Sequence, residues 1–403
     1  MTVTLARAEA PEVSVLIVTY GGWDLARQAL EAVRDHTRRP SEVIVVDNAS
    51  PDGTGERLRT EVRGATVVLN GRNVGFGPAV NQAAALARGR YLALLNSDAL
   101  VRPGWLEPLV ERLQGDPTVG AVVSRLLNAD GTVQEAGSLL WSDGSTLAFG
   151  AGAAGGDPAY RFARTVDYGS AACLLIRRSV FLDVGGFDPA YVPAYCEDVD
   201  LCLALRELGL RTVYEPRSDV VHVRFGSTDA SAAAGLIEAN REVLRHRRAG
   251  ALARQVAPPG PHHPHREVAG RDAHAHDRVL VVADRAPRTL LLALAAAFPD
   301  GRVTVLSTGG PPDPETADEL ARAGVEVAFP DDLERWFGAR LFHVSAAVAV
   351  GPELPAAVAE LLRRTQPQAP VIESGPRPDP SAVIERLGAV GVVADAGGPR
   401  RGP

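Results

Sequence analysis

The chain has 403 residues, of which 46% are hydrophobic and 23% charged, a composition typical of globular proteins that excludes a chain disordered throughout. A single hydrophobic core does not extend over more than ~300 residues, and longer chains divide into domains, so we expect two domains. All 42 basic residues are arginine and the net charge is -7, which gives no polybasic surface for nucleic acid, and the lack of lysine excludes a Walker-type phosphate loop or a Schiff base.

Short aliphatic runs alternate with helical patterns through the first half of the chain. Runs this uniformly apolar are typical of strands buried on both faces, as in a parallel sheet covered by helices. Between the runs, apolar residues recur at helical spacing from Leu25 to Val33, and Pro78 and Pro103 stand where helices can begin. The predicted strands are Val13–Val18, Val43–Val46, Thr66–Leu69 and Tyr91–Leu95.

Polar residues directly follow each of these four runs. In open parallel sheets, ligands bind beyond the carboxyl ends of the strands. We therefore expect the polar residues to converge on one cleft. They are Thr19–Tyr20, Asp47–Asn48, Asn70–Asn73 and Asn96–Asp98.

Residues 125–165 have weak periodicity and predict loops or short strands over that cleft, where ligand specificity often lies. An ordered pattern resumes at Asp167–Ile176. It is followed by a predicted helix near Glu197–Leu208, with Leu201, Leu205 and Leu208 on its apolar face. Two strands are then expected, near Arg211–Tyr214 and Asp219–Val223.

Prolines and histidines interrupt the pattern at residues 249–277, which indicates an interdomain linker. Its histidines lack matched carboxylates or cysteines, which favours a solvated tract over a metal site. The sequence thus predicts a first α/β domain at residues 1–248 and a second, Rossmann-like α/β domain at 278–403. The second domain has no Gly-x-Gly-x-x-Gly after its first strand. Its expected strands are Arg278–Ala283, Val303–Leu306, Val325–Phe329, Val344–Val350, Val371–Ile372 and Val390–Ala394.

Three cysteines, Cys173, Cys196 and Cys202, lack Cys-x-x-Cys spacing, so neither a zinc knuckle nor a disulfide framework is indicated. A reducing cytosol is the simplest compartment. The longest apolar run, Leu290–Phe298, is shorter than the ~20 residues of a membrane span, and residues 1–12 lack a signal-peptide core. We expect a cytoplasmic protein without a transmembrane segment, at most peripheral to the inner face of the membrane.

Two of the strand ends carry residues suited to binding a nucleotide. Asn96-Ser97-Asp98 closes a buried strand, and an aspartate oxygen there suits Mg²⁺ or Mn²⁺, which would bridge the phosphates of a nucleoside diphosphate. Asp47 is placed to accept hydrogen bonds from a base N–H or a ribose hydroxyl. Taken separately, both segments are also compatible with ordinary turn chemistry.

Glu197 and Asp198 open the predicted helix that ends near Leu208. Carboxylates at this position are candidates for general-base catalysis. Acidic residues in a first helical turn also complement the helix dipole, so the pair by itself does not decide between the two roles.

Together, these segments resemble the inverting family 2 glycosyltransferases of the glycosyltransferase-A fold, notably the bacterial rhamnosyltransferase-like members. The resemblance covers roughly Val13 to Thr228. The matching segments are Val15-Leu-Ile-Val-Thr-Tyr20, Val45-Val-Asp-Asn-Ala-Ser50, Asn73-Val-Gly-Phe-Gly77 with Asn81, Leu94-Leu-Asn-Ser-Asp98, Gly185-Gly-Phe-Asp188, Glu197-Asp-Val-Asp-Leu201 and His222.

The resemblance implies roles for these positions. Thr19, Tyr20 and Asp47 would hold the nucleoside. Asn73 and the glycine loop after it would line the donor pocket, together with Asn96 and Ser97. The remaining implied role is that of the metal ligands, Asp98 and His222, for Mg²⁺ or Mn²⁺.

The chain departs from the family pattern in two places. The metal motif usually begins with aspartate, and here Asn96 replaces it with a neutral group, which weakens the expected site. After His222 the sequence runs Val-Arg-Phe-Gly-Ser-Thr228, where more glycine or a second histidine is usual, so Arg224 is a candidate to face the diphosphate.

The implied reaction is a single displacement with inversion. Asp198 is the expected base and Glu197 the residue that positions it. The donor would be a dTDP-rhamnose-like sugar or a UDP-sugar, and the acceptor a glycan, lipid-linked or small-molecule hydroxyl, in cell-surface polysaccharide, glycolipid or natural-product glycosylation. The alternatives are a non-catalytic glycosyltransferase-like scaffold and a sugar nucleotidyltransferase. The latter is disfavoured because Thr19-Tyr-Gly-Gly22 lacks the basic residues of its glycine-rich loop.

Overall fold

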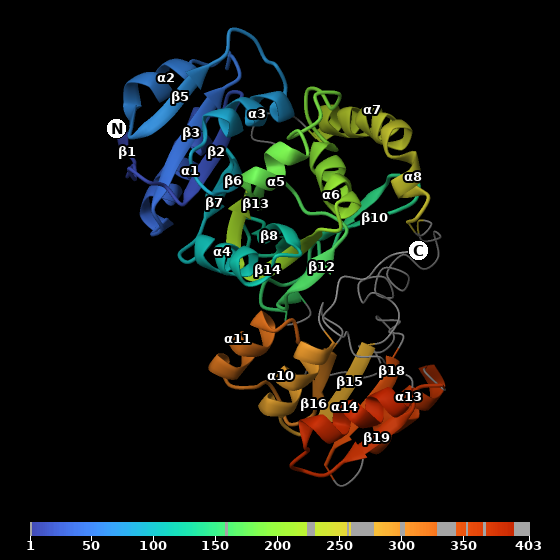
Figure 1. Cartoon of the computed structure of the whole chain (residues 1–403). Coiled ribbons are helices and arrows are strands. Elements are labelled where there is room, and N and C mark those ends of the chain that lie inside the picture. The colour runs from blue at the N-terminus through green and yellow to red at the C-terminus, as the bar shows by residue number, and fades with distance from the viewer. Residues whose placement is uncertain are drawn as a thin grey trace. The chain divides into compact units, whose positions relative to one another are not determined.

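The computed structural model of the chain, shown in Figure 1, describes residues 2–157, 160–223, 230–255, 258, 278–298, 303–328, 344–351, 354–365 and 368–390. The chain divides into two compact units. The first comprises Met1–Gly155 and Val166–Pro258, and the second comprises Gly156–Thr165 and Pro259–Pro403. Among the described residues, no helix is long and apolar enough to cross a membrane.

The first unit is built on a ten-stranded sheet of order β12-β14-β8-β13-β6-β2-β3-β5, to which β7 and β9 add at β14 and β8. The four strands predicted in the first half of the chain form the run β6-β2-β3-β5, and their pairings are all parallel. The strands are β2 (Val13–Thr19), β3 (Ser41–Asp47), β5 (Ala65–Leu69), β6 (Tyr91–Asn96), β7 (Ala99–Val101), β8 (Val119–Leu127), β9 (Val133–Glu135), β12 (Arg164–Val166), β13 (Cys173–Arg177) and β14 (Arg211–His222).

Two small sheets accompany the main one. β1 (Val3–Thr4) pairs in parallel with β4 (Val62–Arg63), and β10 (Ser138–Leu140) pairs antiparallel with β11 (Thr146–Ala148). The segment expected to hold loops or short strands therefore holds short strands, β9 to β12.

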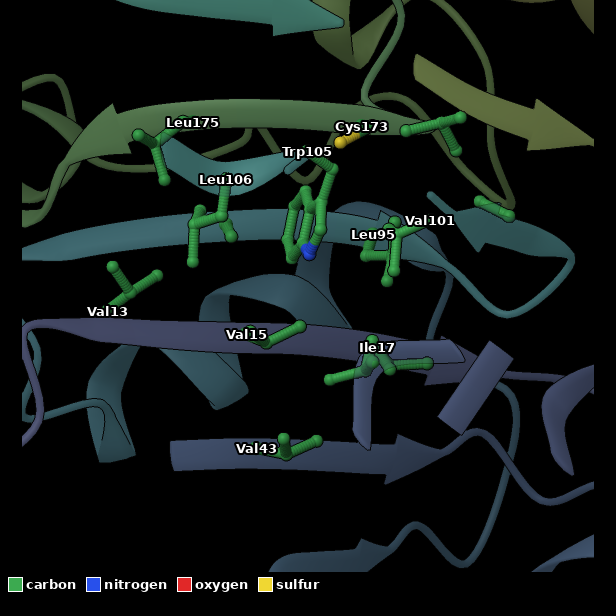
Figure 2. Packing of buried hydrophobic residues seen from close by; sticks show 14 of the residues in the cluster. Val13, Val15, Ile17, Val43, Leu95, Val101, Trp105, Leu106, Cys173 and Leu175 are labelled. Carbon is green, nitrogen blue, oxygen red and sulfur yellow. The ribbon is translucent and has the colours of Figure 1, made fainter. Parts of the chain in front are cut away.

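Helices cover both faces of the main sheet, since all seven residues of β2 are buried. Val13, Val15 and Ile17 share one face of β2, and Figure 2 shows them in a row with Trp105 and Leu106 beside them. α1 and α4 supply this core cluster, while α3 packs against β2 and β3. The helices are α1 (Trp23–His36), α2 (Thr54–Glu61), α3 (Phe76–Leu86), α4 (Leu106–Gly115), α5 (Arg178–Asp183), α6 (Glu197–Glu207), α7 (Ala230–Arg247) and α8 (Ala249–Leu252).

Two features of the main sheet differ from the sequence-based expectation. β8 is fully buried but was not predicted, because Arg125 interrupts its apolar pattern; the charge is neutralised by Asp219 at 2.7 Å. The two strands expected at residues 211–223 are one strand, β14. Its register shifts between Glu215 and Asp219, so the charged, proline-containing break is a bulge within the strand.

The apolar face expected for α6 is wrong at Leu208, which is 58% exposed and follows the helix as its C-cap. The buried residues of α6 include Val199, Leu201, Cys202, Leu203 and Leu205.

The second unit holds a five-stranded sheet of order β17-β16-β15-β18-β19 with all pairings parallel. Counted along the chain from the first strand of this unit, the order is 3-2-1-4-5. Its strands are β15 (Arg278–Ala283), β16 (Val303–Ser307), β17 (Glu326–Ala328), β18 (Val344–Val350) and β19 (Val371–Ser374), and its helices are α10 (Arg288–Ala297), α11 (Pro314–Arg322), α13 (Ala356–Thr365) and α14 (Pro380–Ala389).

Several expectations fall on residues that the structure does not describe. The histidine tract at 262–276, Arg224 and residues 391–394 of the expected last strand lie outside the described residues. Val390 is the C-cap of α14. At the start of the expected linker, Ala249–Leu252 form α8, whose Ala251 and Leu252 are buried.

Candidate active site

The first group of polar residues lies at the carboxyl ends of β2 and β3, where Thr19 and Asp47 are register partners. The Thr19 hydroxyl donates to Asp47 Oδ1 at 2.9 Å, the Ser50 backbone N–H donates to Oδ2 at 3.1 Å, and the Ser50 hydroxyl also donates to Oδ1. Thr19 and Asp47 are buried, whereas Tyr20 beside them is 42% exposed. The Asp47 carboxylate is thus fixed in place, and its oxygens can still accept further bonds.

Backbone from α2 approaches Asp47 closely. A Cβ added to Gly55 would lie 2.7 Å from Asp47 Oδ2, well inside van der Waals contact. Only glycine at this position lets α2 pass so near the carboxylate.

The predicted glycine loop after β5 is held by Asn48. The Asn48 side-chain amide donates to Gly75 O at 3.0 Å, and its oxygen accepts from Val74 N at 3.2 Å. The exposed Asn73 accepts from Gly75 N at 2.9 Å through its side chain. Asn73 therefore shapes the loop and stays open to a ligand, while Asn48 anchors it.

Asn81 joins two of the sequence segments through a pair of hydrogen bonds. Its amide donates to Phe187 O at 2.8 Å and its oxygen accepts from Phe187 N at 2.9 Å. α3 is thereby tied to the Gly185–Asp188 segment. Asn81 has a structural role here.

A second group of polar residues lies after β6. His222 Nε2 is 3.2 Å from Asp98 Oδ1 and 3.3 Å from the Asn96 side-chain nitrogen. The histidine is brought there because β7 pairs antiparallel with the end of β14, with His222 opposite Ala99. Ser97 lies between Asn96 and Asp98 in the turn before β7. Since Val18 is the register partner of Asn96, this group lies at the same sheet edge as Thr19.

Gln134 of β9 is a site residue that the sequence analysis missed. Its side-chain oxygen lies 2.7 Å from His222 Nδ1, and Gln134 is buried. It lies 88 residues before His222 in a segment of weak periodicity, so no local pattern marks it.

The third group opens α6 and follows a strained turn. Tyr195 and Cys196 have φ of 81° and 72°, a left-handed conformation that is unfavourable for side chains other than glycine. The buried Asn240 of α7 donates to Ala194 O at 2.7 Å and to Tyr195 O at 3.1 Å, and Phe76 N donates to Pro193 O at 2.7 Å. Donors from α3 and α7 therefore hold the turn that aims Glu197 and Asp198.

The two carboxylates differ in their hydrogen bonds. Asp198 accepts from Ala171 N at 3.3 Å and from Val199 N at 2.9 Å. Glu197 is 5% exposed, and its Oε2 atom is buried without a hydrogen-bond partner. Unpaired carboxylate oxygens are costly to bury, so this atom points to a ligand group that belongs there.

Burial and mutual repulsion set the acidity of this pair. Burial, reinforced by the Asp198 charge, raises the pKa of Glu197 well above its usual value. Burial also raises the pKa of Asp198, opposed by the hydrogen bonds from Ala171 and Val199. The pKa of Tyr195 is raised by burial and then by the charges of Glu197 and Asp98.

Asp200, the third carboxylate of the segment, has a different environment. It accepts from Tyr191 Oη at 2.9 Å and from Arg248 through two bonds of 2.6 and 2.9 Å. Its charge is compensated by Arg248. Asp200 is therefore a structural aspartate, unlike the carboxylates of Glu197 and Asp198 at the start of the helix.

The raised pKa of Glu197 leads to a stability prediction for Glu197→Gln. The folded protein keeps a proton that the unfolded chain has lost, so the free energy of unfolding falls as pH rises from the ordinary glutamate range through the raised pKa. The glutamine variant has no ionisable group at this position, so its free energy of unfolding does not decrease with pH for this reason. We expect a higher melting temperature than wild type at pH 8, with the difference vanishing near pH 4, by thermal unfolding.

Glu9→Gln, on an exposed glutamate, is the control and should follow wild type at every pH. Equal melting temperatures of Glu197→Gln and wild type across this range would contradict the assigned burial penalty.

Among the described residues, no group of three or more His, Cys, Asp or Glu side chains gathers as a metal site. Asp98 and His222, the two expected metal ligands, lie next to each other. The structure thus brings the predicted residues to one sheet edge in two groups, Thr19 with Asp47 and Asn96 with Asp98 and His222.

Comparison with known proteins identifies the family of the chain. Residues 14–185 match the model of Glycosyl transferase family 2. The chain is 30% identical over 247 residues to the N-acetylglucosaminyl-diphospho-decaprenol L-rhamnosyltransferase of Mycobacterium tuberculosis, covering 55% of this chain and 79% of that protein. It is 33% identical over 242 residues to the O-antigen biosynthesis protein RfbC of Myxococcus xanthus, covering 55% of this chain and 18% of that protein.

A further relative is the protein y4gI of Sinorhizobium fredii, 30% identical over 222 residues, or 53% of this chain and 24% of the relative. The chain therefore spans a quarter or less of the length of two of these three relatives.

The fold and the relatives define a glycosyltransferase with an α/β fold of the glycosyltransferase-A type and a mainly parallel sheet. The chain belongs to glycosyl transferase family 2, in its rhamnosyltransferase-like branch.

Proposed function

We propose that this glycosyltransferase transfers a sugar from a nucleoside diphosphate donor to an acceptor hydroxyl with inversion at the anomeric carbon. The observation that carries the proposal is the pair Glu197–Asp198, in which Glu197 is buried with an unpartnered carboxylate oxygen, Asp198 is partly buried, and both pKa values are raised. A glutamate that merely complemented the helix dipole would be solvated or hydrogen-bonded at both oxygens, unlike Glu197.

Asp198 is proposed as the base. Its carboxylate accepts the proton of the acceptor hydroxyl as the oxygen forms its bond to the anomeric carbon. The bond from that carbon to the diphosphate oxygen breaks, and the nucleoside diphosphate departs from the opposite face. Two backbone N–H groups hold Asp198 in one orientation, and holding the acceptor in line supplies the entropic part of the rate enhancement. Glu197 is proposed to position the acceptor through its free oxygen.

A divalent cation, Mg²⁺ or Mn²⁺, is proposed to be held by Asp98 and His222. His222 Nε2 and Asp98 Oδ1 lie 3.2 Å apart, so one cation would be within reach of both side chains. Rotation of the Asn96 amide would direct its oxygen to the same point. When bound, the ion would offset the charge that develops on the diphosphate.

The nucleoside is proposed to bind at Thr19, Tyr20 and Asp47, and the donor sugar near Asn73 and Ser97. Among donors, dTDP-rhamnose leads, because the similar mycobacterial protein is named as an L-rhamnosyltransferase. UDP-sugars come next. The names of the relatives also favour an acceptor in cell-surface polysaccharide or a lipid-linked glycan over a small molecule.

The second unit is proposed to be a Rossmann-like domain, since its parallel strand order of 3-2-1-4-5 is that of such folds. We propose for residues 278–403 a structural or partner-docking role, with half of a second transferase as the alternative. The catalytic domain is assigned to residues 1–248.

The decisive experiment is a panel of dTDP- and UDP-sugars with Mg²⁺ or Mn²⁺, scored by thermal shift and by slow donor hydrolysis. One donor should raise the melting temperature in the presence of the cation and release nucleoside diphosphate. Pyrophosphate release from a nucleoside triphosphate plus a sugar phosphate would identify a nucleotidyltransferase instead. Absence of any stabilisation would identify a non-catalytic scaffold.

Gly55→Ala tests the nucleoside site. The added methyl would push the Asp47 carboxylate from its position, while alanine in α2 favours the helix, so the fold is kept. A hydrogen bond to a charged group is worth about 1.5–3 kcal/mol, so nucleoside diphosphate should bind roughly 10- to 100-fold more weakly by calorimetry.

The matched control is Gly115→Ala in α4, where an added Cβ meets nothing within 4 Å. Undiminished binding in Gly55→Ala would remove Asp47 from the nucleoside site.

A further inference from the structure

A chain of side-chain hydrogen bonds leads away from His222 toward the surface. His222 Nδ1 is 2.7 Å from Gln134 Oε1, and the Gln134 amide nitrogen is 2.9 Å from Asn128 Oδ1. The Asn128 amide nitrogen is 2.9 Å from the Thr132 hydroxyl, whose proton goes to Asp130 Oδ1 at 2.6 Å. Four consecutive bonds thus connect the proposed cation ligand to an exposed carboxylate.

The direction of this chain is determined at its far end. The hydrogen bond from Thr132 lowers the pKa of Asp130, which is therefore ionised and can only accept. The Thr132 hydroxyl donates its hydrogen to Asp130, so its oxygen accepts the bond from the Asn128 amide nitrogen. Asn128 consequently presents its oxygen to Gln134.

A second acceptor fixes the orientation of Gln134. Its amide nitrogen also donates to His222 O at 2.8 Å, so both amide hydrogens are used. If the amide were turned over, its oxygen would lie against two other acceptor oxygens, His222 O and Asn128 Oδ1, which is unfavourable. Its Oε1 must therefore face His222 Nδ1. That ring nitrogen then has to carry a hydrogen.

We infer that Gln134 is a positioning residue that keeps His222 in the Nδ1–H tautomer and so leaves Nε2 bare toward Asp98 and Asn96. The inference rests on the proposed function, in which Nε2 is a cation ligand. Metal-bound histidines commonly donate their second ring N–H to a fixed acceptor, and loss of that acceptor weakens metal binding about 10- to 100-fold. Here a neutral amide is the acceptor. A donor chain that ends at Asp130 orients it.

The first test observes the tautomer in wild-type protein. The protein is labelled with ¹⁵N-histidine and examined by NMR without added cation at pH 8, and the His222 signals are assigned by their loss in His222→Gln. The expected pattern is a protonated Nδ1 and a bare Nε2. A protonated Nε2 with a bare Nδ1 would overturn the inference, whatever the protein binds.

The second test measures Mn²⁺ affinity by electron paramagnetic resonance. Gln134→Met, which keeps the length of the side chain and removes the acceptor, should bind Mn²⁺ 10- to 100-fold more weakly and should show a mixture of His222 tautomers. Gln114→Met is the control, because that glutamine is exposed on α4; it should match wild type.

The outcomes separate this inference from the proposed function. If wild type and His222→Gln bind Mn²⁺ equally, the cation site is misplaced, and the NMR pattern still decides the role of Gln134. If His222→Gln loses Mn²⁺ while Gln134→Met keeps wild-type affinity and a single Nδ1–H tautomer, the positioning role is wrong and the cation site stands.

Discussion

Asp198→Asn is expected to lower sugar transfer by a factor on the order of 10² or more, with donor binding unchanged. The amide has nearly the shape of the carboxylate, and its single oxygen can keep one of the two backbone bonds, from Ala171 or from Val199, so the site should remain assembled. It cannot take the proton of the acceptor hydroxyl. Transfer is measured as initial rate with the donor identified by the panel, and donor binding by calorimetry.

The pH dependence of transfer provides a second measurement on the same group. A base works only when ionised, and burial raises the pKa of Asp198. The transfer rate should therefore decrease as the solution is acidified, and this decrease should begin at a higher pH than the ionisation of an ordinary aspartate would give. This acid limb should be absent from the residual activity of Asp198→Asn.

Asp24→Asn is the matched control, since Asp24 is an exposed acidic residue in the first turn of α1. If Asp198 served only to complement a helix dipole, both variants would lose a few tenths of a kcal/mol of stability and neither would lose transfer. Near-normal turnover of Asp198→Asn would transfer the base assignment to another group, with Glu197 the nearest.

Asp98→Ala is expected to abolish the cation-dependent part of donor binding. Asp98 is the one charged member of the group it forms with Asn96 and His222, so its loss leaves two neutral ligands for a divalent ion. We expect the enhancement of donor affinity by Mn²⁺, measured by calorimetry with and without the ion, to drop by a factor on the order of 10².

Asp183→Ala, at the exposed end of α5, serves as control and should retain the full Mn²⁺ effect. Donor affinity in the absence of cation should be similar in all three proteins. An undiminished Mn²⁺ effect in Asp98→Ala would show that the ion is held elsewhere.

The sheet edge that carries the site could be predicted because a parallel strand places its next residue at a known position. Thr19, Asp47 and Asn96 each follow an apolar run, and the structure places them at one edge. The rule needs only the order of residues within a few positions of each strand.

Other features depend on partners far away in the sequence. Glu197, Asp198 and Asp200 are equivalent in the sequence, and they are distinguished by Arg248, which neutralises only Asp200 from 48 residues further on. The strand β8 was not predicted for the same reason, because the charge of Arg125 is compensated by Asp219, which is distant in the sequence. Local pattern contains no information on such pairs, and so Gln134 was also missed.

The contacts that hold α6 set a lower limit on the length of an active fragment. The family match ends at residue 185, and Asn240 and Arg248, which secure the strained turn and Asp200, lie far beyond it. Leu252 buries its side chain in one cluster with Tyr191 and Val199. A protein shortened to the recognisable motifs would retain Glu197 and Asp198 but lose the contacts that hold them in their orientation. Fragments and fusions should therefore keep the chain at least through Leu252.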